Sequence, residues 1–142
     1  MSTATDFPAS GKVTAVNGST VTFIPFNTNY ELQLQTDMPY TGPLNSPVEG
    51  LIRVDARKVW TVPSGGNFIT PIAGPPRIVQ GRVRYFSDDT LVLHAGTDLL
   101  VNLPDLDTAF DLTSGPITIG RMVNVTLLPG ATFELLKQPA AK

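Results

Sequence analysis

Few residues in this sequence could carry out catalysis, and they do not form a familiar catalytic set. His94 is the only histidine, and as a general base it would need an orienting carboxylate and a nucleophile or substrate within hydrogen-bond reach. Asp98 follows in the next turn, and Asp88 and Asp89 lie across a predicted hairpin. The Gly-x-Ser-x-Gly signature of serine hydrolases is absent. We therefore interpret His94 as a strand-end surface residue and predict no catalytic residue and no enzyme; a hydrolase using His94 is the least favoured alternative.

Metal and cofactor chemistry has little support in the sequence. The chain contains no cysteine, which excludes thiolate ligands and disulfides. Asp105, Asp107 and Asp111 form a carboxylate cluster of the kind that calcium prefers, but acids in the first turn of a short helix explain them equally well. No glycine-rich phosphate loop connects a strand to a helix. The sequence thus predicts neither a metal nor a cofactor.

Basic and aromatic residues gather in two places and suggest a candidate binding surface. Guanidinium groups beside an aromatic ring can bind an anion or stack on a nucleobase. On a solvated surface the same groups pair with nearby acids, and we favour that interpretation, with Asp55, Asp88 and Asp89 as the expected partners. Arg77 and Tyr85 lie next to the second group. The candidate ligand-binding residues are Arg53, Arg57, Lys58 and Trp60 in the first group, and Arg82, Arg84 and Phe86 in the second.

Composition describes a globular chain without a large charged field. Hydrophobic residues make up 42% and charged residues 15%, and the net charge is −2, with a small negative excess in each half. Bulk binding to nucleic acid needs an excess of positive charge, so it is disfavoured, although a local basic patch stays open. The sequence shows neither a signal segment nor an apolar run long enough to span a bilayer. We expect a cytoplasmic protein.

An internal repeat organises the chain. The segment 81–94 has the same plan as the segment 11–24, which lies 70 positions earlier: Gly, a basic residue, Val, a polar turn, Thr, and then an apolar alternation. The alternations are typical of strands, and the 12 Gly and 13 Pro residues favour strands over helices. The expected organisation is a flexible arm at 1–10, a β-barrel module at 11–62, a Pro/Gly linker at 63–76, a second module at 77–137 and a tail at 138–142.

Five strands are expected in each module. Asn17 and Gly18 predict a tight turn in the first hairpin, and a turn at Arg57 and Lys58 separates the predicted fourth and fifth strands of the first module. A short helix is expected within 104–112, where Pro104 and the following acids match a helix start. The other predicted strands occupy 12–16, 21–26, 30–35, 51–56 and 59–62 in the first module, and 82–86, 91–94, 99–103, 121–128 and 132–136 in the second.

This strand order resembles the OB-fold, and the Gly-basic-Val hairpins at 11–24 and 81–94 are similar to those of S1-type small β-barrels. The resemblance implies an all-β protein with two tandem five-stranded OB-like barrels from an internal duplication; a single β-sandwich is the alternative. The outward positions of the second and third strands depart from nucleic-acid-binding OB barrels, because they carry no aromatic, Lys or Arg residue. They are Thr22, Ile24, Glu31, Gln33 and Gln35 in the first copy, and Val92, His94, Leu100 and Asn102 in the second.

Apolar residues on both faces of several strands give the functional prediction. Such strands need cover on both sides, and the cover can come from the other module, from the linker or from another chain. The sequence therefore predicts a non-enzymatic binding or structural module that acts through protein–protein contact or self-association. Single-stranded nucleic-acid binding is the alternative. The surplus apolar residues are Val16, Ile24, Leu51, Val62, Phe86, Val92, Leu100, Met122 and Leu128.

Overall fold

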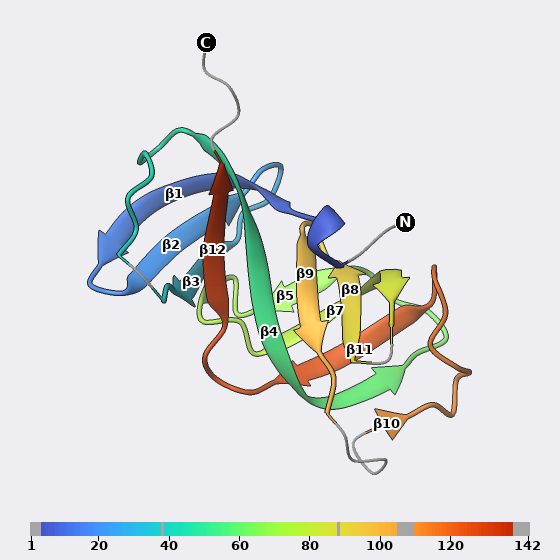
Figure 1. Cartoon of the computed structure of the whole chain (residues 1–142). Helices are drawn as coiled ribbons and strands as arrows, with labels where there is room; N and C mark the ends of the chain where they lie inside the picture. Colours follow the sequence, from blue (N-terminus) through green and yellow to red (C-terminus); the bar gives the residue numbers. More distant parts are fainter. Residues whose placement is uncertain (1–3, 38, 88, 105–109, 138–142) are drawn as a thin grey trace.

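The computed structural model describes residues 4–37, 39–87, 89–104 and 110–137, and this part of the chain is all-β (Figure 1). The all-β prediction is confirmed. Apart from the short 3-10 helix η1 (Ala4–Asp6), the elements are strands of one mixed sheet. They are β1 (Ala9–Asn17), β2 (Thr20–Pro25), β3 (Glu31–Gln35), β4 (Pro47–Thr61), β5 (Phe68–Thr70), β6 (Ala73–Gly74), β7 (Ile78–Phe86), β8 (Thr90–His94), β9 (Asp98–Asn102), β10 (Phe110–Asp111), β11 (Met122–Leu127) and β12 (Thr132–Lys137).

Strand pairing forms two closed circuits that share β4. In the first circuit β1, β2 and β3 are antiparallel neighbours, β12 runs parallel to β3, and β4 pairs antiparallel with both β12 and β1. In the second circuit β7, β8 and β9 are antiparallel neighbours, β4 runs parallel to β9, and β11 pairs antiparallel with β4 and β7. Figure 1 shows β4 running between β1–β3 on one side and β7–β9 on the other.

Each circuit takes one strand from the other half of the sequence. The last strand of the described residues, β12, pairs with β3 and the first part of β4, where Phe133 lies opposite Ile52. The second part of β4 pairs with β9 and β11 of the second half, where Val59 lies opposite Val125. The strands therefore form one sheet and not two separate sets. The finer predictions of two tandem barrels or a single sandwich stay predictions.

The predicted turn at Arg57 and Lys58 is wrong, because both residues lie inside the continuous strand β4. Lys58 pairs with Thr126 and Ala56 with Leu127, which leaves Arg57 as an extra residue in a β-bulge. A bulge shifts the inward positions by one residue: Ile52, Val54 and Ala56 are buried before it, and Val59 and Thr61 after it. A turn interrupts the apolar alternation in the same way, so the sequence pattern alone does not distinguish a turn from a bulge.

The first hairpins of the two circuits have the same register at a spacing of 70 positions. Lys12 lies opposite Ile24, Arg82 lies opposite His94, and both hairpins have a bulge at the corresponding place, after Val13 and after Val83. Gly11 and Gly81 are also equivalent. A Cβ atom at Gly11 would lie 2.3 Å from the carbonyl oxygen of Ile24, and one at Gly81 would lie 2.4 Å from that of His94. Only glycine fits at such a close backbone approach.

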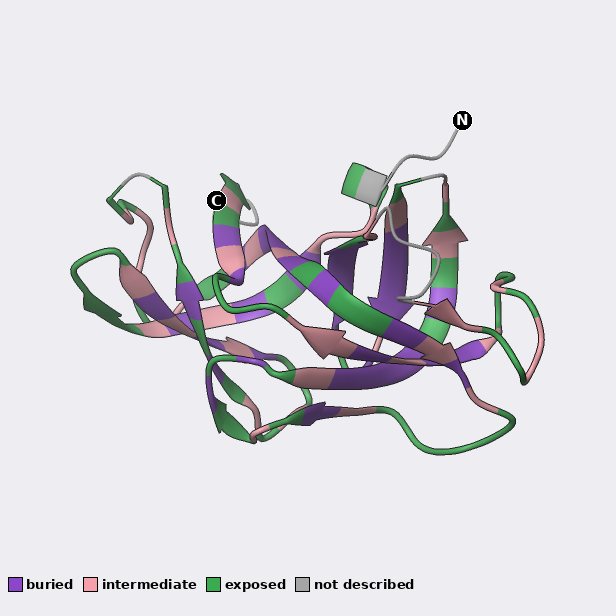
Figure 2. Cartoon of the chain, turned by 90° about the horizontal axis from the view of Figure 1, so that it is seen from below, coloured by how far each residue is buried: buried purple, intermediate pink, exposed green. Residues whose placement is uncertain are grey.

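The apolar core is continuous across both circuits. Figure 2 shows buried residues along strands of both halves, and they form one large cluster that includes Phe23 and Leu32 from the first circuit and Leu93 and Leu99 from the second. The core therefore holds the two circuits together as one unit.

A smaller cluster explains part of the surplus of apolar residues. Leu51, Val92 and Leu100 are buried under Phe7, which follows η1, with Tyr85 beside them. The cover is thus the N-terminal segment, which the sequence analysis treated as a loose arm. Met122 is also buried, whereas Val16, Phe86 and Leu128 stay exposed and Ile24 and Val62 are partly buried.

Two further segments differ from expectation. The helix expected within 104–112 is wrong at Phe110 and Asp111, which form β10 and run parallel to Val59 and Trp60; residues 105–109, including Asp105 and Asp107, lie outside the described residues. In the segment 63–76, β5 pairs with β7 and β6 pairs with β3. Within the described ranges, no helix has the length and apolarity needed to cross a membrane.

Candidate functional site

The first predicted basic group lies along β4, and most of its side chains have partners within the molecule. Arg53 forms an ion pair with Glu134 of β12. The Lys58 ammonium lies 5.2 Å from the centre of the Trp60 ring, a cation–π contact. Asp55, the predicted ion-pair partner, instead accepts a hydrogen bond from the side chain of Asn102 at 2.9 Å. Arg57 is exposed at the bulge of β4.

The second group lies on β7, and its two arginines have different partners. Arg82 donates a hydrogen bond of 3.0 Å to the carbonyl oxygen of Gly120. Arg84 contacts Asp98, and its guanidinium carbon lies 5.3 Å from the centre of the Phe7 ring. Phe86 is 44% exposed. Between β7 and β4 runs β11, which pairs with both, so the two basic groups lie on strands that are not direct neighbours.

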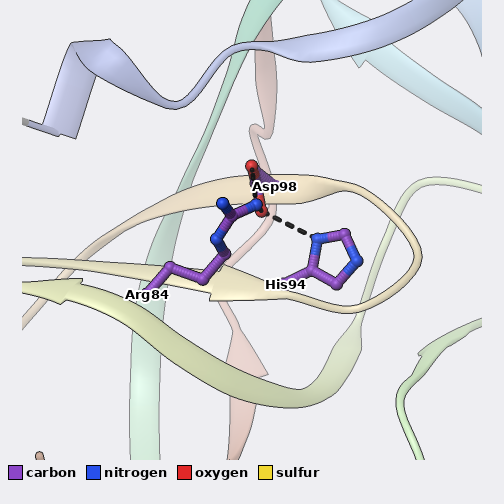
Figure 3. A network of polar contacts seen from close by, with 3 residues as sticks. All are labelled: Arg84, His94 and Asp98. Atoms are coloured by element: carbon purple, nitrogen blue, oxygen red, sulfur yellow. Dashed lines mark hydrogen bonds and ion pairs between the residues drawn. The ribbon is translucent and has the colours of Figure 1, made fainter. Parts of the chain in front are cut away.

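Arg84, His94 and Asp98 form a polar cluster around one carboxylate (Figure 3). The Nη1 atom of Arg84 lies 3.0 and 3.3 Å from the two carboxylate oxygens of Asp98, and Nδ1 of His94 lies 2.9 Å from one of them. The side chain of Asp98 is only 10% exposed, compared with 47% for Arg84 and 43% for His94. Asp98 is therefore the buried centre of the cluster, and the side chains of Arg84 and His94 form its outer part.

Strand register explains this arrangement. His94 ends β8 and lies opposite Asp98 at the start of β9, and side chains of directly opposed residues share one face of the sheet. Arg84 is the extra residue at the bulge of β7, between the pairs made by Val83 and Tyr85. Since an ionised carboxylate only accepts hydrogen bonds, Nδ1 of His94 must carry the hydrogen, which leaves Nε2 for other contacts.

A groove lies where the two halves of the chain meet, and we call it the junction groove. It has a volume of about 580 Å³. Tyr30 helps to close it, because its hydroxyl accepts a hydrogen bond of 3.1 Å from the backbone N–H of Ile69. A Cβ atom at Gly96 would lie 3.2 Å from Thr28 and 3.3 Å from Tyr30, and Gly96 has φ +87°, so a larger residue is disfavoured there. The lining residues are 27–30, 67–70, 72 and 94–96.

The junction groove is uncharged apart from the ionisable imidazole of His94. The side chains of Asn27, Asn29 and Asn67 line it and have no hydrogen-bond partner within the described ranges. Each carboxamide offers two N–H donors and a carbonyl acceptor. Asn27 has φ +66°, a conformation that Asn tolerates better than most residues. Phe68 and Ile72 supply apolar surface to the same groove, whereas Ile69 is buried.

Comparisons with known proteins do not identify the chain. No family model matches it, and no significant match is found among curated proteins or solved structures. The comparisons therefore give no indication of enzymatic activity.

Metal binding has no support in the described part of the chain, where no group of three His, Asp or Glu side chains could hold an ion. Asp111, one of the three clustered aspartates, accepts a hydrogen bond of 3.1 Å from the backbone N–H of Thr113, and this bond lowers the pKa of Asp111.

The sequence alone indicated part of this site. It placed Asp98 in the turn after His94, and the two side chains do meet. The asparagines were not predicted, although the length of their loop is a signal. In the first circuit the five residues 26–30 connect β2 to β3, whereas in the second circuit only the three residues 95–97 connect β8 to β9. The longer polar connection supplies Asn27 and Asn29.

Proposed function

We propose that this protein is a non-enzymatic binding module that holds an uncharged, extended segment of a partner protein in the junction groove. One observation carries the proposal: three asparagines whose side chains have no hydrogen-bond partner within the described residues line the junction groove together with Phe68 and Ile72, at the contact between the two halves of the chain. Carboxamides can pair with both the N–H and the C=O groups of a peptide backbone. Phe68 and Ile72 offer a surface to an apolar side chain of the peptide, and the lack of charged lining groups apart from His94 favours a neutral peptide.

Selection of displayed random peptides on the intact protein tests this proposal, followed by affinity measurement by fluorescence anisotropy. Ile72→Arg changes a residue of the groove that is 62% exposed, so the fold should tolerate it. Ile119→Arg is the matched control, since Ile119 is 72% exposed and lines a different hollow. We expect Ile72→Arg to weaken binding at least tenfold and Ile119→Arg less than twofold. Equal binding to both variants, or no enriched peptide, would refute the proposal.

We also propose that the two circuits are copies of one five-stranded, OB-like unit produced by duplication, with their fifth strands exchanged. The supporting observations are the equal registers at a spacing of 70 positions and the equivalent glycines 11 and 81. A parallel contact with the third strand is also present in both circuits: β12 makes it with β3, and residues 53–55 of β4 make it with β9. In this proposal Asp98 corresponds to Glu31, and His94 to Ile24, so the polar cluster belongs to the second copy alone.

Self-association is a second candidate, favoured by the exposed Val16 and Phe86, which occupy equivalent positions of the two hairpins. The strands of both circuits have neighbours on two sides within the described chain, so contact through side chains is favoured over extension of a sheet edge. Light scattering after size exclusion should show a stable oligomer at low and high salt. A monomer at both would contradict this candidate.

A hydrolase using His94 is favoured by one observation: His94 is oriented by a carboxylate and lines the junction groove. The hydroxyl of Thr28 already donates to the carbonyl oxygen of Pro25, so it is poorly suited to act as a nucleophile. Single-stranded nucleic-acid binding has less support, because Arg53 and Arg84 already pair with acids and Lys58 covers Trp60. Activity of the wild type towards simple esters that is lost in His94→Gln would favour the hydrolase.

A further inference from the structure

Guanidinium groups without partners single out a second region of the surface. Of the six arginines in the sequence, four have side-chain contacts with acids or carbonyl oxygens: Arg53, Arg82, Arg84 and Arg121. Arg57 and Arg77 have no such contact within the described ranges. Both are exposed, and both line the same hollow of about 420 Å³, which we call the arginine hollow.

The two arginines reach the arginine hollow from opposite sides of β11. Arg57 is the extra residue of the bulge in β4, opposite Thr126 and Leu127. Arg77 lies on the other side, where its carbonyl oxygen accepts a hydrogen bond of 2.8 Å from the backbone N–H of Leu127. Two strand spacings of about 4.8 Å separate the backbones of β4 and β7, and two arginine side chains can together span that distance.

The arginine hollow contains no acidic group. Its other lining residues are two threonines, one proline and two aliphatic residues: Thr70 and Thr126 offer hydroxyl donors, and Ile78 and Leu127 offer apolar surface beside Pro71. Two like charges without a counterion repel each other, and an anion between them would remove that repulsion. The planar guanidinium fork matches the oxygens of a phosphate or sulfate group.

We propose that the arginine hollow is a binding site for a single phosphate group, held by Arg57 and Arg77 with hydroxyl donors from Thr70 and Thr126. The net charge of −2 disfavours a long polyanion, so the site recognises one phosphate and not a long stretch of backbone. The group can belong to a small phosphorylated molecule or to a nucleic-acid strand, and the experiment below distinguishes these sources. The arginine hollow shares Thr70 with the junction groove, but this proposal does not depend on the function proposed for that groove.

We test the proposal by titrating the full chain at low ionic strength and monitoring its amide chemical shifts. The three probes are inorganic phosphate, a phosphate monoester and a short single-stranded oligonucleotide. We expect saturable shifts at residues 57, 77, 126 and 127. Arg77→Gln should weaken phosphate binding at least tenfold. Arg82→Gln removes the same charge from an exposed arginine of β7 and should weaken binding less than twofold. Arg57→Lys keeps the charge but removes the fork, and should weaken binding three- to tenfold.

Each outcome decides the question. Saturable binding of phosphate and the monoester assigns the site to small phosphorylated molecules. Binding of the oligonucleotide alone, lost in Arg77→Gln, assigns it to a nucleic-acid phosphate. Absence of saturable shifts with every probe, or an equal loss in Arg82→Gln, would overturn the proposal.

Discussion

The exchange of strands between the circuits predicts an energetic coupling between Phe23 and Phe133. The two rings lie 4.9 Å apart between centroids, and both residues are buried. Phe133 comes from the last described strand, and Phe23 from the second. If the fifth strand of the second module stayed with its own module, Phe133 would lie against the position equivalent to Phe23, which is Leu93.

The magnitude follows from the geometry. Phe→Leu conserves most of the volume of a core side chain and should cost about 1 kcal/mol at each position. An aromatic pair at this distance contributes about 0.5–1.5 kcal/mol beyond its buried area. The double variant Phe23→Leu/Phe133→Leu should therefore be more stable than the sum of the single changes predicts, by about 0.5–1.5 kcal/mol.

Urea unfolding of the wild type, the two single variants and the double variant measures this coupling. A second cycle with Leu93→Val and Phe133→Leu is the control, and its effects should add within about 0.5 kcal/mol. Additivity for Phe23 with Phe133, together with coupling for Leu93 with Phe133, would refute the exchanged arrangement.

Three further predictions concern single residues. Gly81→Ala should lower the free energy of unfolding by about 2 kcal/mol, because the added methyl group would meet a backbone carbonyl. Gly66→Ala is the control: nothing lies within 4 Å of its new atom, so the free energy of unfolding should change by less than about 0.5 kcal/mol. Thermal unfolding compares the two variants. Asp98→Ala should cost about 1 kcal/mol in urea unfolding, because Arg84 is nearly half exposed and its ion pair is screened by water. Since alanine removes the acceptor, an unchanged Nδ1–H tautomer in the ¹⁵N spectrum of His94 would contradict the orienting role of Asp98. Phe7→Ala should cost about 2 kcal/mol and increase amide exchange at Val92 and Leu100, whereas unchanged exchange would show that Phe7 does not cover them.

Local patterns in the sequence were sufficient to predict the hairpins. The glycines at 11 and 81 and the alternating residues after them predict two similar hairpins, and the registers agree with that expectation. Asn17 was expected in the first turn, but β1 continues through Asn17 and the turn is Gly18–Ser19, where Gly18 has the positive φ. A tight turn depends on two or three neighbouring residues, so the sequence predicts its position to within one residue.

Long-range pairing could not be predicted in the same way. The alternation in Val59–Val62 and in Thr132–Leu136 shows that each segment is a strand with one inward face, but not which strand it pairs with. Both segments carry apolar residues that are buried in the one core cluster, among them Val59 and Phe133, so burial alone does not assign either segment to a circuit. The choice depends on the bulge at Arg57, which keeps β4 continuous where a turn would send the chain back.

The candidate site was predicted where its residues are close in sequence and missed where they are distant. His94 and Asp98 are four positions apart, and a hairpin brings them together. Asn27 and Asn67 are far apart in sequence and line the same groove, where a hydrogen bond from Ile69 to Tyr30 connects the segment 63–76 to the first circuit. Arg77 was grouped with Arg82 and Arg84, yet it shares a hollow with Arg57 across β11.

The place of β12 in the first circuit has a consequence for biosynthesis. A ribosome releases the chain from its N-terminus, so β1 to β4 emerge long before β12, which ends at Lys137. Until β12 has emerged, β3 and the first part of β4 lack the strand that lies between them. The second part of β4 stays unpaired until β9 and β11 have emerged. Pairings between such distant segments make folding slow. A nascent chain that stops before β12 leaves both circuits' shared strand partly unpaired, so β12 must be translated before this part of the chain can reach its native state.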